Sequence, residues 1–155
     1  MFRFRPVVMS ALVLVAVGAP ACSNNSSSSL PTTPSPTINT DILTGTVGVP
    51  VNGTLQSSSN TFVVGQGGGS VSVTLTSAVE TLPGGTLLPN VSMGLGLGTP
   101  SGTTCAVLTN GFTTASPGGS PQLNGTLNAG TYCVQVSDIT NQVGPVAYAV
   151  AVAHP

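Results

Sequence analysis

Apolar side chains occupy every second position along several stretches of this chain. The alternation is clearest at residues 71–75, 91–97, 132–136 and 146–152, and a shorter run covers residues 47–51. In the last of the long runs, alanines fill the positions between the larger apolar residues. Because successive side chains of a strand point to opposite faces, a period of two predicts strands with one buried face. The pattern therefore predicts an all-β fold.

Residue pairs that favour tight turns separate these runs. Glycine, preceded by asparagine or by proline, supplies the positive φ angles that such turns need, so antiparallel hairpins are predicted. The turn candidates are Asn52-Gly53, Pro83-Gly84-Gly85, Asn110-Gly111, Pro117-Gly118-Gly119, Asn124-Gly125 and Ala129-Gly130. The glycine-rich stretch at 65–69 lacks the lysine of a phosphate-binding loop and is predicted to be another hairpin. Residues 42–155 suffice for one domain with a two-layer core.

A secretory signal peptide is predicted at residues 1–21. Arg3 and Arg5 form its basic start, residues 7–17 form an apolar run broken only by Ser10, and small residues follow. The apolar run is shorter than the roughly 20 residues that cross a bilayer, so a retained membrane helix is the less favoured alternative. The chain is therefore expected to be exported.

Cys22 directly follows the predicted cleavage site. Ala21-Cys22 resembles the end of the bacterial lipoprotein lipobox, whereas Ala19 and Pro20 depart from its usual pattern. The resemblance implies that Cys22 carries lipid and anchors the chain in a membrane. The same bond fits ordinary signal peptidase, which would leave a free thiol, so both fates of Cys22 stay open. Residues 22–41, rich in Ser, Asn, Thr and Pro, are predicted to be a disordered tether.

The chain has three cysteines, which is an odd number for an exported protein. Assigning Cys22 to lipid leaves Cys105 and Cys133 to form a disulfide in an oxidising compartment. A redox pair usually has Cys-x-x-Cys spacing, so a structural bridge is favoured. Alternation places Cys133 on the opposite face from Tyr132 and Val134, and the bridge is expected on the outer side of its sheet.

Charged side chains are almost missing from the predicted domain. Arg3 and Arg5 are the sole Lys or Arg residues of the chain, and they leave with the signal peptide. Without such residues the domain cannot neutralise phosphates, so nucleic acids and anionic lipid headgroups are excluded as partners. Little electrostatic repulsion keeps copies of such a surface apart, so weak self-association is expected.

Several segments together resemble a known family. Phe62-Val63-Val64, the glycine-rich stretch, the run at 71–75 and the segment 127–136, which contains Ala129-Gly130-Thr131-Tyr132, are similar to the bacterial pre-peptidase C-terminal domain. The resemblance covers residues 45–153 and implies a single jelly-roll-like antiparallel β-sandwich, here of about seven to nine short strands. In that family the module usually accompanies a secreted protease, but no protease domain is present here. Residues 90–95 also lack the acidic strand that the family often has, so the resemblance implies no calcium site there.

The sequence offers no catalytic constellation. A serine hydrolase needs a histidine held by an acid and close to a nucleophile, whereas His154 lies in the last dipeptide, where chain ends fray. Asp41, Glu80 and Asp138 are far apart in the sequence, and Asp138 is predicted to form a turn with residues 139–141 rather than to bind calcium. We therefore expect no catalytic residue, metal site or cofactor, and no enzyme activity.

The predicted function is that of a non-catalytic, membrane-anchored β-sandwich lipoprotein that binds an envelope protein or glycan, or has a structural role. Phe112, in the predicted turn at 110–112, is the aromatic side chain expected to be exposed and a candidate partner contact; Phe62, Tyr132 and Tyr148 have core spacing. Ser23 after the cysteine is typical of lipoproteins delivered to the outer membrane or cell surface. A periplasmic or secreted soluble form is the alternative location, and a hydrolase or carbohydrate-binding module with an unrecognised site is the alternative function.

Overall fold

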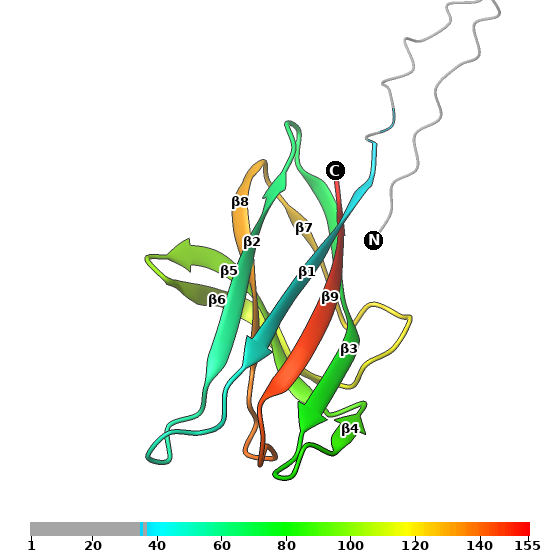
Figure 1. Ribbon diagram of the computed structural model, residues 1–155. Helices are drawn as coiled ribbons and strands as arrows, with labels where there is room; N and C mark the ends of the chain where they lie inside the picture. Colours follow the sequence, from blue (N-terminus) through cyan, green and yellow to red (C-terminus); the bar gives the residue numbers. More distant parts are fainter. Residues whose placement is uncertain (1–34, 36) are drawn as a thin grey trace, which may run out of the picture. The chain divides into compact units, whose positions relative to one another are not determined.

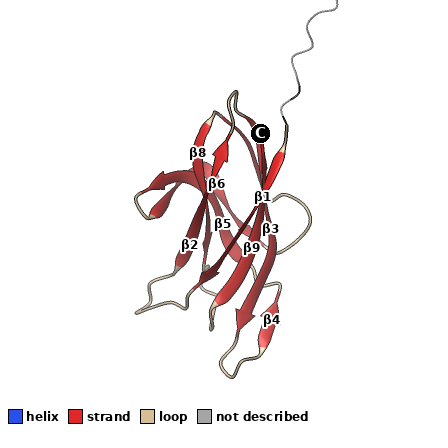
Figure 2. Ribbon diagram, turned by 45° about the horizontal axis from the view of Figure 1, so that its top comes forward, coloured by secondary structure: helices blue, strands red, loops and turns tan. Residues whose placement is uncertain are grey.

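A computed structural model describes residue 35 and residues 37–155. The predicted signal peptide, Cys22 and most of the predicted tether lie outside the described residues. The described part contains nine strands and no helix (Figure 2). It therefore has no helix that could cross a membrane. The strands are β1 (Asn39–Val47), β2 (Ser57–Val64), β3 (Gly69–Thr81), β4 (Leu87–Pro89), β5 (Met93–Ser101), β6 (Thr104–Ala115), β7 (Leu123–Leu127), β8 (Gly130–Ser137) and β9 (Val146–His154).

The strands form two antiparallel sheets that pack as a β-sandwich (Figure 1). One sheet has the order β1-β9-β3. The other edge of β3 pairs with β7 near the start of β3 and with the short β4 near its end. The second sheet has the order β2-β8-β5-β6. Chain neighbours β1 and β2, and likewise β8 and β9, lie in different sheets, which is the Greek-key connectivity of a jelly roll. The predicted fold class is confirmed.

The alternating runs supply the core of the sandwich. Val73, Leu75, Leu95, Val136 and Val150 are fully buried, as the period of two predicts. The remaining members of the core follow the same rule and include Val71, Met93, Leu97, Val134, Val146, Tyr148 and Val152. The run at 47–51 is the exception, because β1 ends at Val47 and Val49 and Val51 are exposed. Alternation alone does not show where a strand stops pairing.

The predicted turns are correct where they connect strands and wrong where a strand continues through them. Asn52 and Gly53 have φ angles of 52° and 78° and close a tight turn between Val51 and Thr54. Asn110-Gly111, however, lies inside β6, and Asn124-Gly125 lies inside β7. Asn110 keeps a positive φ of 61° there, where the pairing of β5 with β6 shifts register. Asn110-Gly111 thus indicated the local backbone conformation correctly, but this conformation forms a bulge within β6 rather than a hairpin turn.

The glycine-rich stretch at 65–69 is a turn, but it is not a hairpin. It connects β2, in one sheet, to β3, in the other. Gly68 has a φ of 65°, and a Cβ on it would lie only 2.4 Å from the Leu127 carbonyl oxygen. Close approach of two backbones therefore requires glycine at this crossing.

The domain begins earlier than composition indicates. Residues 39–41, assigned to the tether from their polar composition, belong to β1, where they pair with residues 152–154 of β9. Asp41 Oδ2 also lies 3.1 Å from His154 Nε2. Polar residues can form an edge strand when a long neighbouring strand supplies the hydrogen-bonding partner, and local composition does not reveal that neighbour.

Candidate functional site

The structure contains the predicted disulfide between Cys105 and Cys133. Cys133 lies in the middle of β8, on the opposite face from the core residues Val134 and Val136, as expected. Cys105 lies near the start of β6, and β5 pairs with both strands. Both cysteines are nevertheless buried, and β5 runs between them, pairing with Cys133 at Gly98 and with Cys105 at Pro100. The bridge therefore holds the hairpin against β8.

Gly98 makes room for this bridge. It pairs with Cys133 across the sheet, and a Cβ on Gly98 would lie 2.9 Å from Cys105 Sγ and 2.3 Å from the Ala106 carbonyl oxygen. The sulfur atoms therefore cross β5 at a residue without a side chain. The sequence indicated the cysteine pair, but it did not indicate that a glycine was needed between them.

His154 is held inside the fold, so the expectation of a frayed end is wrong. Its side chain is 93% buried and packs against the ring of Phe62 at a centroid distance of 5.4 Å. Nε2 lies 3.1 Å from Asp41 Oδ2, and Nδ1 lies 3.1 Å from the Pro155 carbonyl oxygen. Both ring nitrogens already have oxygen partners. A histidine so engaged has no nitrogen left to activate a hydroxyl nucleophile.

Phe112 is exposed, as predicted, but it lies within β6 rather than in a turn. Its ring passes over Gly94 of β5, where a Cβ would contact Phe112 Cζ at 2.8 Å and the Ser137 hydroxyl at 2.4 Å. Phe62 and Tyr148 are buried and Tyr132 packs against the core. The arrangement offers one half-exposed ring beside a hydroxyl, on the outer face of the second sheet.

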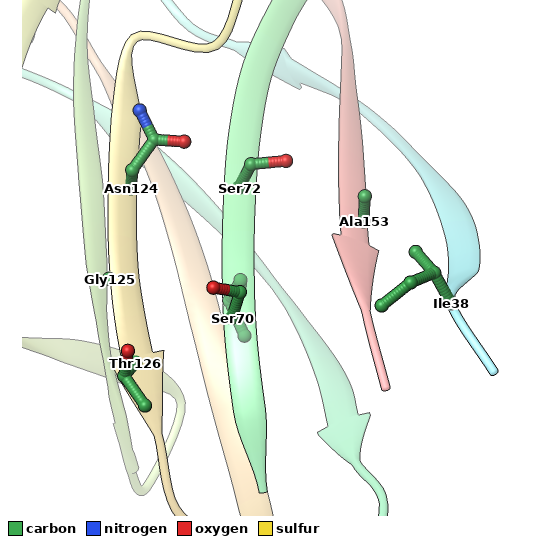
Figure 3. A pocket seen from close by; sticks show the side chains of 8 residues that line it. Ile38, Ser70, Ser72, Asn124, Gly125, Thr126 and Ala153 are labelled. Carbon is green, nitrogen blue, oxygen red and sulfur yellow. The ribbon is translucent and has the colours of Figure 1, made fainter. Parts of the chain in front are cut away.

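A shallow groove of about 430 Å³ lies on the outer face of the first sheet (Figure 3). Ser70 and Ser72 of β3 face it beside Asn124 and Thr126 of β7. Ile38 and Ala153 close its other side. The lining combines hydroxyl, amide and aliphatic groups and contains no charged or aromatic side chain. It therefore offers hydrogen bonds but no group that could carry out acid, base or nucleophilic chemistry by itself.

The loop between β8 and β9, residues 138–145, is fixed by two carboxylates. Asp138 Oδ1 accepts hydrogen bonds from the backbone N–H groups of Thr140, at 2.9 Å, and Asn141, at 3.3 Å. This is the turn that the sequence predicts for Asp138. The backbone N–H groups of Val143 and Gly144 donate to Glu80 Oε1, at 2.5 and 2.7 Å. The two carboxylates thus hold successive parts of one loop.

Sequence reasoning missed the role of Glu80. Its side chain is only 2% exposed and points from the end of β3 into the β8–β9 loop. A glutamate at an alternating position of a strand normally indicates a solvent-exposed face, so its sequence context gives no sign of burial. Gly144 packs closely against Thr81, where a Cβ would collide with the Thr81 carbonyl oxygen, and this contact helps to bring the loop over the Glu80 carboxylate.

Three loops meet at the end of the sandwich opposite to the pairing of Asn39 with His154 (Figure 1). We call residues 48–56, residues 82–89 and residues 138–145 the distal loop end. The Asp138 N–H donates to the Gln56 carbonyl oxygen at 3.0 Å, which joins the first and third loops. The Thr81 N–H, at the end of β3, donates to the Pro145 carbonyl oxygen at 2.9 Å, which joins the third loop to the strand from which the second loop starts. The third loop is therefore attached to the first loop and to the end of β3, beside the start of the second.

Exposed aliphatic side chains gather on the distal loop end. Of the ten large apolar side chains that the described residues expose, six lie there: Val49, Val51, Leu55, Leu87, Leu88 and Val143. Val143 and Leu87 are 64% and 63% exposed. Glu80 and Asp138, the acidic residues in this region, are both buried. Apolar groups without charges on connecting loops are typical of an interaction surface.

Among the described residues, no three His, Cys, Asp or Glu side chains gather closely enough to hold a metal ion by themselves. Comparison of the chain with protein-family models, with curated proteins and with solved structures finds no match.

Proposed function

We propose that this chain is an exported, lipid-anchored and non-catalytic β-sandwich module of the bacterial cell envelope, which binds a partner through its distal loop end. The observation that carries this proposal is the set of six exposed aliphatic side chains on that end. Residues 35–155 contain no Lys or Arg, so the surface has no means of attracting an acidic partner. The partner that fits is a neutral, partly apolar protein surface.

The position of the surface agrees with a tethered receptor. The described chain starts where β1 pairs with the end of β9, and the distal loop end lies at the other end of these strands. A tether before β1 would therefore leave the three loops free to meet a partner. The engagement of both His154 ring nitrogens supports a binding role over hydrolysis.

Polar substitution of the distal loop end is expected to abolish partner capture. We predict that the triple variant Val51→Ser, Leu87→Ser and Val143→Ser reduces in-cell crosslinking at least tenfold, because apolar contacts at the centre of an interface carry most of the binding energy. All three side chains are exposed, so the melting temperature is expected to change little. The measurement is the yield of crosslinked adduct, with mass spectrometry to identify the attached molecule.

Val63→Ser is the matched control, because Val63 is also 60% exposed but lies near the other end of the sandwich. It is expected to leave crosslinking unchanged. An adduct of twice the monomer mass identifies a second copy of the chain as the partner. Equal loss in Val63→Ser, or no loss in the triple variant, contradicts the proposed surface. If Phe112→Ala alone abolishes capture, the partner binds the second sheet, as the alternative of a glycan-binding module requires.

The lipid anchor has its own test. We expect Cys22→Ser to move the protein from the membrane fraction to the soluble fraction, because removal of the acyl chains removes the apolar group that holds it in the bilayer. Fractionation with metabolic labelling by a palmitate analogue measures both location and acylation. An unlabelled wild-type chain in the soluble fraction would support the free thiol at Cys22 and a soluble exported form.

A further inference from the structure

Two buried carboxylates, one in the distal loop end and one beside it, have no cationic side chain among the described residues to neutralise them. Glu80 is 2% exposed and Asp138 is 3% exposed. The one ion pair within the described residues joins His154 to Asp41, at the other end of the sandwich. Residues 35–155 contain neither Lys nor Arg. Buried carboxylates are normally paired with a cation or coordinate a metal, and no Lys or Arg of the described residues is present to pair with these two.

Polar atoms of the same loop are buried without partners. Asp138 Oδ1 binds two backbone N–H groups, but Oδ2 is buried and accepts no hydrogen bond. The side chain of Gln142 is also buried, and neither Oε1 nor Nε2 has a partner. Native proteins leave few such atoms, and each one calls for an explanation such as a bound ion or an ordered water. Two of these atoms, Asp138 Oδ2 and Gln142 Oε1, are oxygens of the kind that bind a cation, and they belong to residues four positions apart in one loop.

The loop that holds these atoms is rigidly placed. The Asn141 side chain donates to the Ser92 carbonyl oxygen at 2.9 Å, and the Asp138 N–H donates to the Gln56 carbonyl oxygen. Glu80 Oε1 holds Val143 and Gly144, and neither of these bonds uses Glu80 Oε2. Thr140 has a φ of 75°, which is uncommon for a β-branched residue and persists where the surroundings fix the backbone. A ligand would therefore meet preformed oxygen donors.

We propose that a calcium ion binds inside the β8–β9 loop, with Asp138 Oδ2 and Gln142 Oε1 as side-chain ligands. Carboxylate and amide oxygens are the ligands that hard divalent cations prefer, and calcium completes its six to eight ligands with backbone carbonyl groups and water. The ion supplies the positive charge that the protein lacks around Glu80 and Asp138. With few charged ligands the affinity is weak, with a Kd on the order of 10⁻⁴ to 10⁻³ M, as in extracellular calcium modules. The proposal of this calcium site does not rest on the proposed binding of a partner by the distal loop end.

Thermal unfolding of the full exported chain, purified in detergent, tests the site. We expect about 5 mM calcium to raise the melting temperature by roughly 3 to 8 °C over the value in a chelator. The reason is that the ion binds the folded state and not the unfolded state, so its binding stabilises the fold. Asp138→Asn is expected to abolish the rise. This substitution keeps an oxygen for Thr140 and Asn141, so the turn survives, but it removes the charge. Asp41→Asn, which alters the carboxylate at the other end, is expected to retain the full rise.

Equilibrium dialysis with radioactive calcium supplies a second measurement that does not depend on the stability of any variant. One ion bound per wild-type chain supports the proposal. No bound ion together with no change of melting temperature overturns it, and the unpartnered atoms then bind ordered water only. A full calcium response in Asp138→Asn also overturns it, because the ion would then bind elsewhere. Gln142→Leu is expected to weaken calcium binding several-fold, and unchanged binding in that variant removes Gln142 from the site.

Discussion

Replacement of both Cys105 and Cys133 by alanine is expected to lower the free energy of unfolding by roughly 3 to 4 kcal/mol. The bridge joins residues 28 positions apart, and in the chain-entropy model the cost of closing such a loop is removed from the unfolded state. The loss of stability should appear as a fall in melting temperature of roughly 10 °C. Urea unfolding, followed by circular dichroism, measures the change in the free energy of unfolding, and thermal unfolding measures the change in melting temperature.

The physical reason for a large effect is the position of the bridge. It joins the start of β6 to β8 across the intervening strand β5, and Cys133 is only 1% exposed. Beyond the register shift, residues 98–101 pair with residues 104–107, and of these only Gly98 also pairs with β8. We therefore expect faster proteolysis in residues 98–107 of the double variant than in the remainder of the domain.

Cys22→Ser is the control for the loss of a thiol, because Cys22 takes no part in the bridge. It should leave the unfolding midpoint unchanged. Two free thiols from Cys105 and Cys133 in the non-reduced, denatured wild-type chain would contradict the bridge. Equal stability of the wild type and the double variant would contradict its structural role.

Glu80→Ala is expected to destabilise the domain by roughly 3 kcal/mol. The substitution removes the acceptor of both N–H groups and leaves the buried Gly144 donor and the partly buried Val143 donor without their partner. Loss of a partner costs a buried donor about 1 to 3 kcal/mol, and bonds to a charged acceptor lie at the upper end. The measurement is urea unfolding in the presence of a chelator, so that no bound cation contributes to the difference.

Glu80→Gln separates the hydrogen bonds from the charge. The amide oxygen of glutamine can accept both N–H groups, so this variant is expected to recover more than half of the lost stability. Similar destabilisation by alanine and glutamine would show that the two hydrogen bonds are not the source of the effect. Glu80→Ala should also reduce partner crosslinking, because the loop that carries Val143 loses its attachment.

Much of the fold could be predicted because its determinants are local. The alternation in β3, β5, β8 and β9 reports directly which residues face the core, and Leu75, Leu95 and Val150 are buried as expected. The cysteine count predicted the bridge because few alternatives exist for three cysteines. The ends of strands were harder to predict from the sequence, since residues 39–41 are polar and become a strand only by pairing with β9.

The candidate site was much less predictable than the fold. The six aliphatic residues of the distal loop end come from three loops whose meeting depends on the jelly-roll connectivity. Asn124 favoured the same local turn as Asn52, but the pairing of β7 with β3 overrode this preference, whereas Asn110 kept its positive φ and formed a bulge within β6. Phe112 was correctly expected to be exposed, for the wrong reason, because the residue lies in a strand.

Local sequence patterns were enough to predict an all-β domain almost without charge, in which Cys105 and Cys133 form a disulfide. The determinants are alternation, turn residues and composition, which act within a few residues of each other. Tertiary structure alone decided that Glu80 and Asp138 are buried beneath one loop and that exposed aliphatic side chains gather beside them. Burial and proximity depend on strands distant in sequence, and no local pattern contains that information.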